Sequence, residues 1–133
     1  MLKFFRIYGL SCVVALLIFY LSITTSIPNY YHGPRFEGQD KIVHSFLYMF
    51  LTLAICRDFF RQSVIFSSRK MYIWAIILPI LYGGLIEILQ ENFFYPRTAE
   101  WGDWLADILG VFAGYFLGRK IYPKIITPEK KLK

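Results

Sequence analysis

Four long apolar segments constrain what this chain can fold into. A membrane hydrocarbon core about 30 Å thick is crossed by a helix of about 20 apolar residues, and about 17 are enough. The segments that approach this length are residues 4–23, 42–56, 71–90 and 104–122. The second is the shortest, and Asp40 and Lys41 extend it when their side chains reach the polar interface. Each segment is predicted to be a transmembrane helix.

The composition supports this interpretation. Of the 133 residues, 56% are hydrophobic and 20% are aromatic, and the mean hydropathy is +0.45. These values lie far from those of average soluble domains. The sequence therefore predicts a single all-α domain, residues 1–133, which is a polytopic membrane protein with four transmembrane helices. The first segment is long and no A-x-A cleavage pattern follows it, so we expect it to be retained and not cleaved as a signal peptide.

Basic residues predict how the helices are oriented. The positive-inside rule places lysine-rich and arginine-rich loops in the cytoplasm. One side would receive Lys3, Arg6, Arg57, Arg61, Arg69, Lys70, Arg119, Lys120, Lys124, Lys130, Lys131 and Lys133, and the other only Arg35, Lys41 and Arg97. Both termini are thus predicted to be cytoplasmic. The formal charge of +6 is attributed to this topology, with membrane lipids and no nucleic acid as the expected partners.

Polar residues lie in or next to three of the apolar segments. Several recur about every four residues, which is the spacing of one helix face. The residues are Asp40, Lys41, His44 and Tyr48 at the start of the second segment, Glu87 and Gln90 at the end of the third, Arg97 in the following turn, and Asp103 and Asp107 at the start of the fourth. Neighbouring segments run in opposite directions, so all three stripes are predicted to meet at the outer end of the bundle. A carboxylate in hydrocarbon costs about 2.5–3.5 kcal/mol on insertion scales, so this cluster predicts a site.

Glycines lie on the same faces. Gly110, Gly114 and Gly118 form consecutive small-xxx-small steps, which let another helix approach closely. Gly83 lies one helical turn before Glu87, where it would either serve packing or leave room for a ligand. We predict that these four glycines are packing residues.

The polar residues named above lie in three stretches of the chain, DKIVHSFLY, YGGLIEILQ and RTAEWGDWLADILGVFAG. With these motifs the chain resembles the VanZ-like family of small bacterial membrane proteins over residues 40–118. The resemblance implies a role in the envelope at the bacterial cytoplasmic membrane. It also links the chain to glycopeptide resistance, because the family takes its name from a protein associated with teicoplanin resistance. The polar set that carries over is Asp40, Lys41, His44, Tyr48, Glu87, Gln90, Arg97, Asp103, Asp107 and Gly110. Asp107 and Glu100 stand where many relatives have asparagine and serine, and both add negative charge.

The first functional hypothesis is an outward-facing pocket that binds or processes a cell-envelope amphiphile or lipid-linked precursor. Lys41, His44 and Arg97 would hold a phosphate or carboxylate. Glu87 would act as acid or base, with His44 as its partner in proton exchange. The sequence carries no nucleophile elbow, HExxH or phosphate-cradling glycine loop, so whether the pocket is catalytic stays open.

No resident cofactor or metal is predicted. A metal-assisted version of the site would draw on Asp40, His44, Glu87, Asp103 and Asp107, whose spacing resembles no standard metal site.

The second hypothesis is a non-catalytic scaffold or partner subunit in which the polar cluster is structural. His44 would then pair with Glu87 or Asp107, and Arg97 with Asp103 or Glu100, and neutral substitutions would destabilise the fold. A small proton-coupled transporter is a third hypothesis, disfavoured because the charged stripe stays at one end of the bundle. The ligand and the oligomeric state stay open.

Overall fold

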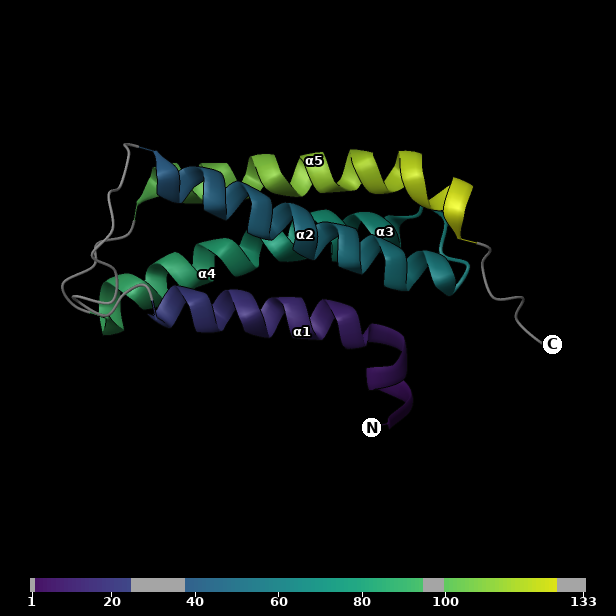
Figure 1. Cartoon of the computed structure of the whole chain (residues 1–133), viewed down its shortest axis with the longest axis horizontal. Coiled ribbons are helices and arrows are strands. Elements are labelled where there is room, and N and C mark those ends of the chain that lie inside the picture. The colour runs from purple at the N-terminus through teal and green to yellow at the C-terminus, as the bar shows by residue number, and fades with distance from the viewer. Residues whose placement is uncertain (1, 25–37, 95–99, 127–133) are drawn as a thin grey trace.

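The computed structural model describes residues 2–24, 38–94 and 100–126, and these residues are almost entirely helical (Figure 1). The elements are α1 (Leu2–Thr24), α2 (Gln39–Arg61), α3 (Arg69–Tyr72), the π-helix η1 (Ile73–Ile77), α4 (Leu78–Phe93) and α5 (Trp101–Ile125). Each of the four predicted segments lies within this helical structure, and the described residues contain no strand. The prediction of an all-α fold is confirmed.

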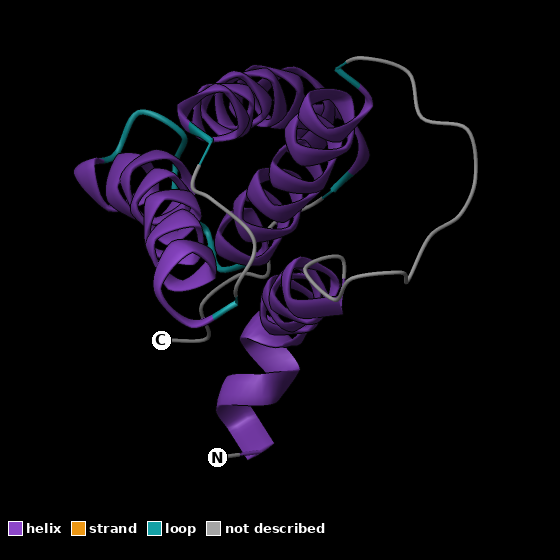
Figure 2. Cartoon of the chain, turned by 90° about the vertical axis from the view of Figure 1, so that its left-hand side faces the viewer, coloured by secondary structure: helices purple, strands orange, loops and turns teal. Residues whose placement is uncertain are grey.

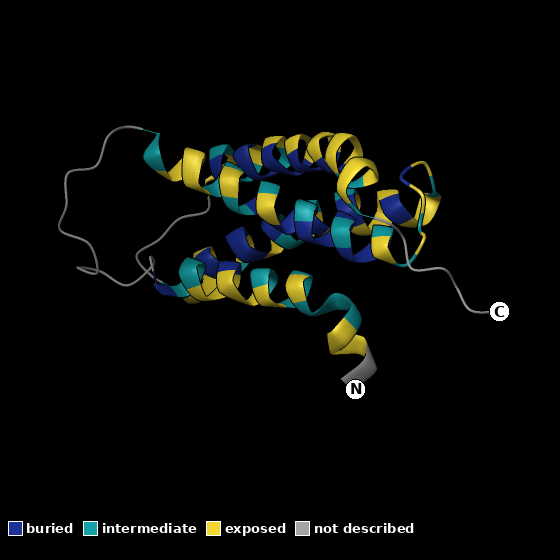
Figure 3. Cartoon of the chain, turned by 45° about the vertical axis from the view of Figure 1, so that its right-hand side comes forward, coloured by how far each residue is buried: buried dark blue, intermediate teal, exposed yellow. Residues whose placement is uncertain are grey.

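Three of the helical segments are long and apolar enough to cross a membrane, namely Phe4–Thr24, Gln39–Arg61 and Arg69–Phe93. This property supports a multi-pass membrane protein. α5 has sufficient length, but Asp103 and Asp107 reduce the hydropathy of its first two turns. Large apolar side chains such as Leu16, Leu109 and Phe116 remain exposed around the outside of the bundle, as a surface in contact with lipid requires (Figure 3).

The helices form an antiparallel bundle in which α2 is central (Figures 1 and 2). α5 lies along α2 as its principal partner, while α1 lies at one edge of the bundle and packs chiefly on α2. The two described ends of the chain lie at the same end of the bundle (Figure 1). The start of α2, the end of α4 and the start of α5 lie at the opposite end, which is where the sequence places the polar stripes.

The close packing of α5 on α2 depends on glycine. A Cβ atom added to Gly110 would collide with the backbone carbonyl of Ser45, and one added to Gly114 would lie 2.5 Å from the Met49 carbonyl oxygen. Only glycine leaves space for a neighbouring backbone at such contacts. Gly118 continues the same face, one turn further along, against Cys56. These contacts set the distance between α2 and α5, and therefore the distance between the side chains that the two helices carry.

The third predicted segment is one continuous helix with a wider turn in its middle. In η1 the Leu78 N–H donates to the carbonyl of Ile73, five residues back. Pro79 provides a physical reason, because proline has no N–H to donate and its ring clashes with the carbonyl four residues earlier. Widening the helix to a π turn relieves that clash. The turn allows the helix to pass Pro79 without a break, so that Glu87 and Gln90 remain in α4.

Candidate functional site

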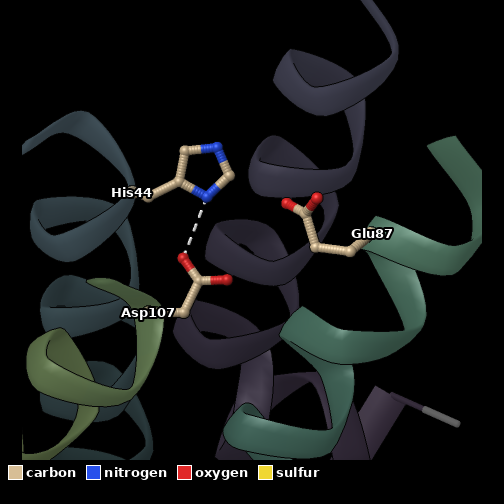
Figure 4. A group of neighbouring side chains, drawn as sticks. All are labelled: His44, Glu87 and Asp107. Carbon is tan, nitrogen blue, oxygen red and sulfur yellow. Dashed lines mark hydrogen bonds and ion pairs between the residues drawn. The ribbon is translucent and has the colours of Figure 1, made fainter. Parts of the chain in front are cut away.

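A pair formed by His44 and Asp107 lies at the centre of the polar cluster. His44 lies in the second turn of α2 and Asp107 in the second turn of α5, and His44 Nδ1 lies 2.9 Å from Asp107 Oδ1 (Figure 4). The aspartate side chain is 1% exposed and the histidine side chain 14%. A hydrogen bond of this length from an imidazole N–H to an ionised carboxylate is charge-assisted. The pair therefore joins α2 to α5 one turn from the Gly110 contact.

Glu87 reaches the same place from a third helix. Its carboxylate, carried by α4, points toward the His44–Asp107 pair (Figure 4). One nitrogen of His44 and one carboxylate oxygen each of Glu87 and Asp107 all lie within 4.8 Å of one another. The residue is buried, and its Oε2 accepts a hydrogen bond of 3.1 Å from the Glu100 N–H, just before α5 begins. This bond ties the end of α4 to the start of α5.

Asp103 and Lys41 form a second layer on the side of the pair that is nearer the first residues of α2 and α5. Lys41 Nζ lies 3.5 Å from Asp103 Oδ1 and 3.3 Å from Glu100 Oε2. Asp103 is almost fully buried, and its other oxygen lies 3.9 Å from His44 Nε2. The Lys41 and Glu100 side chains are about half exposed, so their ion pair adds little to stability. The lysine instead offsets the charge of the buried Asp103, and the other oxygen of Asp103 faces His44 Nε2.

Gly83 and Tyr48 lie on the other side of the pair, toward the middle of the bundle. A Cβ added to Gly83 would lie 2.7 Å from Asp107 Oδ2 and 3.3 Å from the Tyr48 hydroxyl, so only glycine leaves Asp107 its present space. The Tyr48 side chain is 1% exposed, and its hydroxyl has no hydrogen-bond partner among the residues that the structure describes. A hydroxyl beside a buried carboxylate is therefore available to a ligand.

Two other predicted site residues, Gln90 and Asp40, lie outside the His44–Glu87–Asp107 cluster. Gln90 is buried, but its Nε2 donates to the carbonyl of Ser22 at 3.0 Å, so it joins α4 to α1. Asp40 is exposed in the first turn of α2, where an acid complements the helix dipole. Arg97 lies outside the described residues. The structure thus brings together His44, Glu87 and Asp107, with Lys41, Tyr48, Gly83 and Asp103 around them.

A cavity of about 380 Å³ adjoins the cluster between α4 and α5. Glu87 lines it, and its walls include Leu85, Ile88 and Trp101, all of which are more than half exposed on the outside of the bundle. Trp104 closes one side, where its indole N–H donates to the Ile80 carbonyl at 3.0 Å. The cavity therefore connects Glu87 with the apolar outer surface, which is the surface that would face lipid.

One buried charge was missed by the sequence interpretation. Asp58 falls beyond the predicted second segment, but α2 continues to Arg61 and buries it. Its Oδ2 accepts hydrogen bonds from the backbone N–H and the hydroxyl of Ser11, at 3.1 and 2.7 Å, and Arg57 pairs with its Oδ1 at 3.0 Å. The available signal was Ser11, a polar residue in a largely apolar segment, which could have indicated a polar partner on another helix. This contact fixes α1 to α2 at the end of the bundle remote from His44.

No protein-family model, curated protein or solved structure matches this chain.

Proposed function

We propose that the chain is a four-span protein of the bacterial cytoplasmic membrane, with both termini in the cytoplasm and the His44–Glu87–Asp107 cluster near the outer face. The distribution of lysine and arginine supports this orientation. The fourth span would be α5, whose buried Asp103 and Asp107 face α2 and α4 and not the lipid. Shielding by neighbouring helices is the usual way in which a membrane helix carries carboxylates.

Within that topology, the cluster is a binding site for the polar head of a cell-envelope amphiphile or lipid-linked precursor. The observation that carries this proposal is the position of Glu87, a buried carboxylate that also lines a cavity opening on the apolar outer surface. An amphiphile moving in the outer leaflet would place its tail along Leu85 and Ile88. Its head would then meet the carboxylate of Glu87.

The chemistry of the cluster favours a head with hydrogen-bond donors next to Glu87. Lys41 and His44, the described residues of the cluster that could hold an anion, each already face a carboxylate. Hydroxyl, amine and amide groups, which abound in envelope precursors, are the natural partners of a buried carboxylate. The His44–Asp107 pair would accept and return a proton, which makes Glu87 and His44 the candidate acid and base if the site also processes its ligand. The VanZ-like resemblance supports the envelope as the setting and glycopeptide resistance as a phenotype to test.

The experiment is an analysis of amphiphiles that copurify with the protein. The wild-type chain is purified in a mild detergent and analysed by native mass spectrometry. Two variants are treated in the same way, namely Ile88→Trp, which narrows the cavity, and Glu87→Gln. Leu109→Trp is the matched control, because Leu109 is an exposed apolar residue of α5 that lines no described cavity. We expect one class of amphiphile to be enriched in the wild type and the control and lost from the other two. Equal retention in all four proteins would overturn the proposal.

A second function has its own support. Lys41 and His44 each lie beside a carboxylate, and Glu87 accepts a hydrogen bond from the Glu100 N–H. Such contacts are expected of a structural network in a membrane scaffold subunit. That function predicts that His44→Gln lowers the unfolding midpoint by several degrees, because the change leaves Asp107 buried beside a neutral group. An unchanged or raised midpoint would rule out the scaffold and favour the binding site, whose charges are retained at a cost to stability.

A further inference from the structure

We infer that His44, Glu87 and Asp107 together hold a divalent transition-metal ion of the Zn²⁺ class. The three residues come from α2, α4 and α5, and one ligand atom from each lies within 4.8 Å of the other two. Two ligands on one zinc ion, with bonds of about 2.0–2.2 Å, lie about 3.5 Å apart in a tetrahedral arrangement. Small side-chain rotations therefore convert the observed cluster into three ligands of one ion.

The types of ligand indicate which ion would bind. An imidazole nitrogen favours zinc and its first-row neighbours, whereas a site made only of oxygen would suit magnesium or calcium. One histidine and two carboxylates form a three-ligand set, which in zinc proteins is characteristic of sites that keep a fourth position open. Because Glu87 also lines the cavity, an ion held by Glu87 would lie next to whatever enters from the outer surface.

The residues around the three ligands suit a metal ion. In metal sites a ligating histidine commonly directs its second ring nitrogen at a carboxylate, which fixes the tautomer and the orientation of the ring. Asp103 Oδ2 lies 3.9 Å from His44 Nε2, on the side of the ring opposite the Asp107 contact at Nδ1. A separation of 3.9 Å is longer than a hydrogen bond, so Asp103 would have to move closer to hold the proton on Nε2 and direct the Nδ1 lone pair toward Glu87 and Asp107. It is a positioning residue and not a ligand.

An independent observation also points to a ligand at this place. The Tyr48 hydroxyl is buried and lies 3.3 Å from the Cβ position of Gly83, from which Asp107 Oδ2 is only 2.7 Å away. Within the described residues this hydroxyl has no hydrogen-bond partner, which is costly for a buried polar group. A water molecule or headgroup oxygen bound to the ion would provide the missing partner. Gly83 keeps the space beside Asp107 free of side-chain atoms.

The inference deepens the proposed function and rests on it only for the claim that a headgroup reaches the open position. With the ion bound, Glu87 and His44 would be ligands and not an acid and a base. The ion would then let the acidic cluster accept an anionic oxygen, such as that of a phosphate or carboxylate, which the carboxylates alone would repel. Metal binding itself requires no amphiphile and is tested separately.

The test uses the full chain, without a histidine tag, in detergent. Protein is incubated with Zn²⁺, passed over a desalting column and analysed for metal by inductively coupled plasma mass spectrometry. We expect about one ion per chain for the wild type and at least a tenfold lower content for Glu87→Gln and Asp107→Asn, since each loses one of three ligands. Asp58→Asn is the matched control, a buried carboxylate of α2 at the other end of the bundle, and it should keep its metal.

Two further measurements keep the inference falsifiable if a variant does not fold. Co²⁺ in place of Zn²⁺ should give the wild type the intense visible absorption of a low-coordinate ion with nitrogen and oxygen ligands. Asp103→Asn should retain that spectrum but bind about 10–100-fold more weakly, as expected for an orienting partner. A folded wild type without stoichiometric metal, or a metal content that is equal in wild type and Glu87→Gln, would overturn the metal site.

The two proposals fail separately. Enrichment of an amphiphile in protein that binds no metal would remove the ion and leave the proposed function. Stoichiometric metal in a protein that retains no amphiphile would leave the ion and remove the proposed function.

Discussion

Replacing Gly110 by alanine tests whether the contact between α5 and α2 builds the site. The added Cβ would fall on the Ser45 carbonyl oxygen. Because this atom belongs to the backbone of α2, no side-chain rotation relieves the clash, and the two helices must separate by on the order of 1 Å to restore a normal contact distance. Overpacking of this kind costs about 1–3 kcal/mol. For a chain of this size each kcal/mol lowers the unfolding midpoint by about 3–5 °C.

We therefore expect Gly110→Ala to unfold about 3–15 °C below the wild type in the same detergent. The matched control is Gly9→Ala in α1, where a Cβ would meet no atom within 4 Å. There the gain in helix propensity should leave stability unchanged or raise it by up to about 1 kcal/mol. The separation should also move Asp107 away from His44, so Gly110→Ala should lose the metal ion proposed to bind there. Equal midpoints for the two alanine variants would refute the packing argument.

Three further variants separate the site from the scaffold. Gly83→Ala should shift the Asp107 carboxylate, because the new Cβ would lie 2.7 Å from its Oδ2. We expect at least a tenfold loss of metal by titration with a midpoint within a few degrees of the wild type, since a side-chain end moves more easily than backbone; an unchanged affinity would count against the geometry of the site. Tyr48→Phe should leave the midpoint unchanged or raise it, because it removes a buried hydroxyl without a partner among the described residues, and it should weaken metal binding; a large fall in the midpoint would mean that the hydroxyl is bonded in the folded protein. Asp58→Asn should weaken the hydrogen bonds between Ser11 and α2 and lower the free energy of unfolding by about 1–3 kcal/mol. Hydrogen exchange in α1 should then be faster than in the wild type while metal binding is unaltered, and equal exchange rates in α1 of the two proteins would contradict this prediction.

The sequence predicted the number of long helical segments and their positions closely. Apolar runs of membrane-spanning length appear directly in the chain, and each run lies within a helix. The ends were less accurate: the second run was predicted to stop at residue 56, whereas α2 continues to Arg61. Considered residue by residue, the charged positions Arg57, Asp58 and Arg61 are typical of a loop at the end of a membrane helix. In the fold Asp58 has Ser11 as its partner, and that partner is 47 positions away.

The polar stripes predicted which end of the bundle holds the site, but not its composition. Helical spacing places His44 and Tyr48 on one face of α2, and antiparallel connectivity brings Glu87 and Asp107 to the same end. Spacing cannot tell which of several carboxylates contacts the histidine, because that choice depends on the depth and rotation of α5 against α2. Gln90 has the spacing of a site residue, yet it faces α1 and bonds the carbonyl of Ser22.

The sequence by itself determined that this chain makes long helices suited to a lipid environment and that the polar stripes of three of them lie at the same end. These features follow from local chemistry, namely segment length, hydropathy and the repeat of the helix. Only the tertiary structure decided that His44, Glu87 and Asp107 lie close together, that Asp103 lies near His44 Nε2, and that Glu87 lines a cavity. The physical reason is that these relations depend on interhelical distances of a few ångströms. Contacts such as that of Gly110 with the Ser45 backbone set those distances.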